Sequence, residues 1–198
     1  LFDGDFFTAR EEYKIALSST DDDLVRVAAL WGLGKTEFLY ENNPGALDYL
    51  RQLTQNYPQS AYTARAHFLL GETYFNLKRY QESADAYATY QQMRPSLLDA
   101  YVHEKRGDAF FALSNYSEAL TAYQAAMQTD GLTDPASLKI KIADTYFNGG
   151  HAEMALGLYD EVYNASSNDY LKAQMDFQAG QALIALGRSN EAYDRWRH

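Results

Sequence analysis

Cysteine is absent from this sequence of 198 residues, which excludes disulfides, thiolate catalysis and cysteine-ligated metals. The lack of cysteine fits a reducing compartment as well as an oxidising one. The sequence also lacks any apolar run that approaches the roughly 18 residues that a membrane-spanning helix needs. No stretch of the sequence therefore indicates direct insertion into a membrane.

Positive charge is scarce, because 27 Asp and Glu residues outnumber 17 Lys and Arg residues and the formal net charge is -10. No run of lysines and arginines interrupts this acidic composition. Nucleic acids and anionic membrane surfaces repel such a chain, so neither is expected as a partner. The 46% of hydrophobic residues is nevertheless enough for a substantial core.

Motifs of catalysis and of metal binding are missing as well. The sequence contains no Gly-x-Ser-x-Gly, no His-Glu-x-x-His and no phosphate-binding glycine loop. His67 and His103 have no His or carboxylate one helical turn away in both copies, so packing explains them better than metal ligation or general base catalysis. The acidic run of residues 21–23 fits a helix start better than a calcium loop. We expect no catalytic activity, no cofactor and no metal in these residues.

Small residues recur with a nearly fixed period along the chain. Successive members are 37, 36, 36 and 37 residues apart: Gly34, Gly71, Gly107, Ala143 and Gly180. A second small residue follows each of them twelve positions later: Ala46, Ser83, Ala119, Ala155 and Ala192, with Ala9 as a sixth member. A bulky residue stands four positions after that: Tyr13, Leu50, Tyr87, Tyr123, Tyr159 and Trp196. Three columns in register indicate a repeated helix-turn-helix unit.

We name the two helices of each unit helix A and helix B. A small residue on helix A opposite a small residue on helix B lets the two backbones approach closely, while the bulky residue fills the space beside this contact. Gly71 should therefore face Ser83, and Gly107 should face Ala119. Replacing Gly107 with leucine should overpack the contact and cost about 1 to 3 kcal/mol.

Cap and turn signals divide the chain into eleven expected helices. Asn43-Pro44 and Asp134-Pro135 have the form of an N-cap followed by proline at the first helical position, and Ser60 and Ser96 should open helices shortly after a proline. No segment alternates with the period of a strand. The expected helices span residues 5–18, 21–41, 44–56, 60–77, 80–93, 96–113, 116–129, 135–148, 151–164, 168–186 and 190–198.

The repeat resembles the tetratricopeptide repeat (TPR) family, whose pattern is a Leu-Gly pair, an aromatic residue three positions on, then an Ala, an aromatic residue and a Pro. Leu70, Gly71, Tyr74, Tyr87 and Pro95 match it. Departures are Glu37 and Arg106 in place of an aromatic and an aliphatic residue, and Gly131 and Ser167 in place of Pro. The resemblance implies an all-α fold without a β-sheet: a right-handed α-α superhelix over residues 1–198, with a half-repeat at 1–18 and repeats at about 21–57, 59–94, 96–130, 134–166 and 168–198.

The long period and the segment NYPQSAYTARAHFLLGETY look like the bacterial cell-envelope branch of the family, such as Tol-Pal coordinator proteins and the helical regions of lytic transglycosylases. Neither end shows a polar capping element, so we expect the sequence to be a piece of a longer protein. The resemblance implies a non-catalytic scaffold for a peptide or partner protein, in the periplasm, with the cytoplasm left open. The alternative is an accessory helical domain of an envelope enzyme that acts on peptidoglycan.

A second stripe on the A helices points to a binding surface. Residues at i, i+4 and i+7 share one helical face. In the family that the chain resembles, this face lines the concave groove. Its members are Trp31, Lys35 and Phe38, then Phe68, Glu72 and Phe75, then Glu104, Asp108 and Phe111, then Ile140, Asp144 and Phe147, and finally Phe177, Gln181 and Ile184.

Two interpretations of this stripe stay open. The phenylalanines can simply pack between neighbouring A helices, because a large exposed apolar patch is uncommon without a partner. The carboxylates favour binding, because Glu72, Asp108 and Asp144 would repel one another unless a cationic partner or solvent screens them. We therefore expect a partner segment with Lys or Arg between apolar anchors, contributed by another protein or by the same polypeptide. Changing the three carboxylates to serine should weaken its binding without unfolding the chain.

Overall fold

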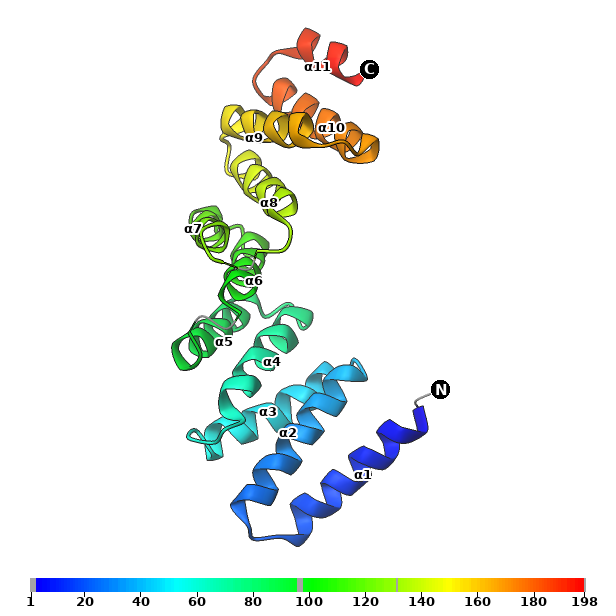
Figure 1. Ribbon diagram of the computed structural model, residues 1–198, viewed down its shortest axis with the longest axis vertical. Coiled ribbons are helices and arrows are strands. Elements are labelled where there is room, and N and C mark those ends of the chain that lie inside the picture. Colours follow the sequence, from blue (N-terminus) through cyan, green and yellow to red (C-terminus); the bar gives the residue numbers. More distant parts are fainter. Residues whose placement is uncertain (1–2, 96–97, 131, 198) are drawn as a thin grey trace. The chain divides into compact units, whose positions relative to one another are not determined.

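The computed structural model describes residues 3–95, 98–130 and 132–197, and every regular element in these ranges is an α-helix (Figure 1). The helices are α1 (Asp3–Ser19), α2 (Asp23–Leu39), α3 (Asn43–Asn56), α4 (Thr63–Asn76), α5 (Tyr80–Met93), α6 (Asp99–Ala112), α7 (Tyr116–Met127), α8 (Pro135–Asn148), α9 (Ala152–Ala165), α10 (Asp169–Ala185) and α11 (Ser189–Trp196). The expected all-helical fold is confirmed. The handedness of a superhelix stays a prediction.

The chain divides into two compact units, one from Leu1 to Leu97 and the other from Leu98 to His198. Within each unit a helix contacts mainly the helices before and after it in the sequence. Helices α2, α4, α6, α8 and α10 are the A helices, and each pairs with the B helix that follows it. Because contacts are local, each unit is a stack of helix pairs in which one pair buries its apolar face against the next.

The contact between helices A and B rests on the three sequence columns. Gly71 and Ser83 meet as expected, and the Ser83 hydroxyl donates a hydrogen bond to the Gly71 carbonyl at 2.8 Å. Tyr87, the bulky residue, lies directly over Gly71 rather than beside it. A Cβ added at Gly71 would come within 2.7 Å of the Tyr87 ring. Gly107 has the same relation to Tyr123. At these two positions helix A carries glycine and the partner ring touches its backbone, whereas the fourth repeat has Ala143 opposite Tyr159.

The turns between helices A and B share one backbone conformation. The seventh residue after each column glycine or alanine has a positive φ: Glu41, Lys78, Ser114, Gly150 and Gly187. At the second turn the Lys78 amide donates to the Phe75 carbonyl at 2.9 Å and the Arg79 amide to the Tyr74 carbonyl at 2.8 Å. This pair of bonds satisfies the last helical carbonyls in a Schellman motif. Each A helix consequently ends at the same position of the repeat.

Two of the expected helix starts are wrong. The cap of α3 is Asn42, whose side chain accepts from the Gly45 amide, so Asn43 is already helical. Helix α4 begins at Thr63 rather than at residue 60, because the Ser60 hydroxyl accepts from the Tyr62 amide in a preceding turn. Asp134 caps α8 as expected, and its carboxylate accepts from the Ser137 amide. Ser96 lies outside the described residues.

The departure from the family pattern at Glu37 has a structural explanation. Glu37 is buried with 3% of its surface exposed, and its carboxylate forms an ion pair with the Arg10 Nε at 3.0 Å. The Asn42 side-chain amide donates a second bond to the same carboxylate at 2.6 Å. A buried carboxylate needs such partners. Helix α1 supplies the guanidinium and is therefore tied to α2 by charge as well as by packing.

Candidate functional site

The aromatic members of the A-helix stripe are half-buried and pack on neighbouring helices, except Phe177, which is 54% exposed. Trp31 and Phe38 pack against the core shared by α2 to α5, and the Trp31 ring stacks on Tyr62 with centroids 6.0 Å apart. Phe111 packs on the core shared by α7 and α8, and Ile140 and Phe147 pack on the core that includes α9 and α10. These rings lie between repeats, as the first interpretation of the stripe requires.

Two further stripe members, Phe68 and Phe75, contact tyrosines of helix α5. The Phe68 ring meets the Tyr90 ring edge to face at 5.3 Å, and the Phe75 ring meets Tyr80 at 5.2 Å. Such pairs favour the close association of helices A and B. Phe68 and Phe75 therefore also contribute to packing within the first unit.

The carboxylates of the stripe accept hydrogen bonds from tyrosines of the bulky column. Tyr87 donates to Glu72 at 2.5 Å, Tyr123 donates to Asp108 at 2.8 Å, and Tyr159 donates to Asp144 at 2.6 Å. Burial raises the pKa of Tyr123 and of Tyr159, and the nearby carboxylates raise both further. These tyrosines were missed as site residues. The constant separation of 15 residues between acid and tyrosine was the available signal.

Lys141 of α8 neutralises two stripe carboxylates of α6. Its Nζ lies 2.7 Å from Glu104 Oε1 and 2.7 Å from Asp108 Oδ1. Burial alone lowers the pKa of Lys141, but the hydrogen bonds with Asp108 and Glu104 outweigh it and leave this pKa raised. Asp108 therefore needs neither a cationic partner nor solvent to screen it, because an internal lysine already does so.

Asp144 has a different environment from Asp108, although it occupies the same position one repeat later. Among the described residues, no lysine or arginine nitrogen lies within 4 Å of its carboxylate, and position 178, which corresponds to Lys141, is glutamine. Burial raises the pKa of Asp144, and the hydrogen bond from Tyr159 opposes this only in part. The half-buried carboxylate thus lacks a counterion at a place where the preceding repeat has one.

Lys35, the basic member of the stripe, is exposed at a pocket of about 330 Å³ between α1 and α2. Trp31, Tyr13 and Leu39 line the same pocket. The Tyr13 ring covers Gly32, where an added Cβ would come within 2.5 Å of the ring. This pocket combines aromatic walls with one cation at its edge.

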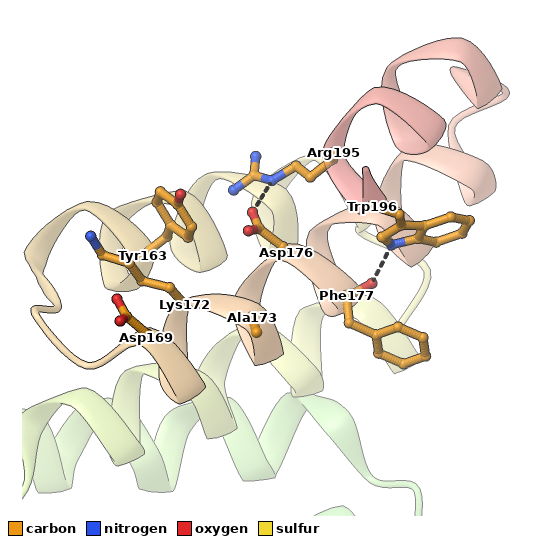
Figure 2. Close-up of a pocket in the computed structure, with 8 residues that line it drawn as sticks. All are labelled: Tyr163, Asp169, Lys172, Ala173, Asp176, Phe177, Arg195 and Trp196. Carbon is orange, nitrogen blue, oxygen red and sulfur yellow. Dashed lines mark hydrogen bonds and ion pairs between the residues drawn. The ribbon is translucent and has the colours of Figure 1, made fainter. Parts of the chain in front are cut away.

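A larger pocket of about 480 Å³ lies among α9, α10 and α11 (Figure 2). Arg195 forms ion pairs with Asp176 at 2.7 Å and with Asp160 at 2.5 Å, and its guanidinium lies 5.4 Å from the centre of the Tyr163 ring. Lys172 contacts the same ring, and Figure 2 shows Phe177 away from it, beside Trp196. Two of the three guanidinium nitrogens of Arg195 are thus held in ion pairs inside the chain.

Within the described ranges, no group of three or more His, Asp or Glu side chains is arranged to hold a metal ion. Burial lowers the pKa of His67 and of His103. No helix in the described part of the chain combines the length and the apolar character needed to cross a membrane.

The helix pairs, the shared turns and the columns define a helical repeat protein. Residues 1–61 and 62–97 match the family described as tetratricopeptide repeat. The first unit is therefore similar to the tetratricopeptide repeat family over its whole length, and the second unit continues the same three columns. A search of curated proteins found no match.

Solved structures of low sequence identity share the fold. MamA from Desulfovibrio magneticus RS-1 has a TM-score of 0.70 at 13% identity, covering 90% of this chain and 94% of that one. BtubC from P. vanneervenii has a TM-score of 0.67 at 15% identity, covering 97% and 85%. The thermophilic TPR protein TTC0263 of Thermus thermophilus has a TM-score of 0.53 at 19% identity, covering 91% and 92%. These likenesses concern the fold alone.

Proposed function

We propose that this chain is a non-catalytic scaffold that binds a protein partner through the A-helix stripe. The single observation that carries the proposal is the half-buried Asp144 carboxylate, which has no cation within 4 Å in the described part of the chain. A buried charge without a counterion is costly. The preceding repeat neutralises the corresponding Asp108 with Lys141, so the geometry for receiving a cation is already built into this stripe.

The chemistry of the partner follows from the surroundings of Asp144. Ile140 and Phe147 flank it on α8 and are only partly buried, so they offer apolar surface on both sides of the carboxylate. A segment with Lys or Arg between apolar side chains would fit this order of groups. The interaction should weaken with salt, because it depends on an ion pair near the surface.

A peptide titration tests the proposal. A labelled peptide with lysine between leucines, and its counterpart with glutamate in place of lysine, would be titrated by fluorescence anisotropy at low ionic strength. We expect only the lysine peptide to bind, and Asp144→Asn to weaken it about tenfold. Glu118→Gln is the matched control, because it removes one negative charge from an exposed position of α7. Equal binding of both peptides, or no effect of Asp144→Asn, would refute the proposal.

We further propose an extracytoplasmic location in the bacterial cell envelope. The support is the period of 36 to 37 residues and the segment of residues 56–74, which resemble envelope members of the family. A reporter enzyme that is active only outside the cytoplasm, fused to the full-length gene product, should be active. The same gene product would reveal the alternative, an accessory domain of a peptidoglycan enzyme, by a catalytic glutamate in a separate helical domain.

A further inference from the structure

One face of α10 carries no charge and is exposed except at the half-buried Gln181, although the chain has a net charge of -10. Its members lie within roughly 120° around the helix axis. We call this surface the α10 face, and it consists of Tyr170, Ala173, Gln174, Phe177, Gln181, Ile184 and Ala185. The charged side chains Lys172 and Asp176 lie on another side of the helix, beside Tyr163 and Arg195. A charge-free exposed face is the composition expected of an interface core.

The preceding repeat shows what such a surface is shaped to contact. Leu156 of α9 is 7% exposed under α10, whereas Tyr193, the corresponding residue of α11, is 63% exposed. Ile140 on α8 is half-buried, whereas its counterpart Phe177 is 54% exposed. The positions of Ile140 and Leu156 are covered by neighbouring helices, whereas the corresponding positions of Phe177 and Tyr193 are open in the described residues. In the preceding repeat an α-helix covers these positions, so another α-helix with an uncharged face would fit this surface.

The α10 face is itself such a helix surface, and its residues are placed symmetrically about Phe177. Tyr170 and Ile184 lie seven positions before and after it, and Ala173 and Gln181 lie four positions before and after it. When two copies of α10 meet antiparallel, Phe177 lies opposite itself, Tyr170 opposite Ile184 and Ala173 opposite Gln181. No like charges meet in this arrangement, which has the self-complementarity of a two-fold contact.

The area is of the order that a weak dimer needs. The Phe177 ring stacks on Trp196 with centroids 6.3 Å apart, and Trp196 meets Tyr193 at 6.1 Å, so α11 extends the apolar surface. Together with Tyr170 and Ile184, these partly exposed side chains present on the order of 500 Å² in each copy. A standard interface takes about 800 Å² from each partner, including a polar rim.

We propose that the α10 face binds a second copy of this chain, forming a two-fold symmetric dimer with Phe177 at the axis. The dimer uses the last stripe members, Phe177, Gln181 and Ile184, and not the part of the stripe around Asp144, so failure of the peptide experiment at Asp144 leaves it standing.

Sedimentation velocity over a concentration series tests the dimer. The wild-type chain should show reversible association, and Phe177→Asp should weaken it about tenfold or more. Met154→Asp is the matched control, because Met154 is 53% exposed on α9 and should leave the association unchanged. Circular dichroism checks the fold, and Ile184→Asp repeats the test without disturbing Trp196. A chain that stays monomeric at every concentration would overturn the proposal. The α10 face would then be open or would bind another protein.

Two double variants test the antiparallel register. Ala173→Lys with Gln181→Glu places opposite charges across the axis, whereas Ala173→Lys with Gln181→Lys places like charges there. The first should associate at least as well as the wild type and the second about tenfold more weakly. Repulsion between the net charges of two chains cannot explain weaker association of the second variant, because its two added lysines make the net charge less negative than in the first. Equal association of the two variants contradicts the register.

Discussion

Gly107→Ala and Gly157→Ala are the same substitution in two helices of one unit, and we expect them to change stability in opposite directions. At Gly107 on α6 an added Cβ would overlap the Tyr123 ring, whereas nothing lies within 4 Å of such an atom at Gly157 on α9. Carbon atoms in contact prefer about 3.5 to 4.0 Å. The Tyr123 ring must therefore move by roughly 1 Å to accommodate the methyl group of Gly107→Ala.

The magnitude follows from three contributions at Gly107. Helix propensity favours alanine by about 1 kcal/mol, and overpacking costs about 1 to 3 kcal/mol. Tyr123 is 2% exposed and its hydroxyl is held by Asp108 at 2.8 Å, so moving the ring also strains a charge-assisted hydrogen bond of about 1.5 to 3 kcal/mol. The net loss should be about 1 to 4 kcal/mol. A value of about 1 kcal/mol is expected, because the next repeat accommodates an alanine, Ala143, at the position opposite Tyr159.

At Gly157 only helix propensity acts, so alanine should stabilise the unit by up to about 1 kcal/mol. Urea unfolding followed by far-ultraviolet circular dichroism measures both variants, and both glycines report on the second unit. A Gly107→Ala chain as stable as Gly157→Ala would refute the reasoning that the ring requires glycine on helix A.

Other substitutions test the site and the turns. Asp108→Asn should cost about 1 to 3 kcal/mol because it removes a counterion of the bridging lysine, whereas Asp144→Asn should be neutral or stabilising because it relieves a buried charge; urea midpoints compare the two. Gly150→Ala should cost about 1 kcal/mol in the same assay, because φ is 83° and no neighbour interferes. Burial lowers the pKa of His67 and His103, so their contribution to stability should be complete above pH 6.5 and fall as the pH drops below it, and replacing both by Gln should flatten that slope in urea unfolding.

The fold was predictable from the sequence because each repeat applies one packing rule. The columns place Gly71 against helix B and the helix bounds agree within a few residues. The start of α4 was not predictable from Ser60, because serine serves equally well as an N-cap and in a turn. The handedness expected from the family and the limits of the repeats stay predictions.

The site was predictable only in part. The stripe located Asp108 and Asp144 correctly on the A helices, but single-helix periodicity does not show what the neighbouring helix contributes. Lys141 lies 33 residues after Asp108, and only the packing of α8 on the preceding repeat brings its amine to that carboxylate. Each of the three tyrosines follows its acid by 15 residues, so this constant spacing could have identified them from the sequence. The packing of the small and bulky columns does not by itself indicate a hydrogen bond between tyrosine and acid.

The most direct test of the scaffold function is to map where a partner binds. Chemical-shift changes in a ¹⁵N-labelled sample of this 22.5 kDa chain would be recorded on adding the lysine-containing peptide. The proposed function predicts changes centred on α8 around Asp144 and Phe147, and none on the exposed side of α9 around Gly157. Changes centred on α9, with the amides of α8 unmoved, would contradict binding through the A-helix stripe.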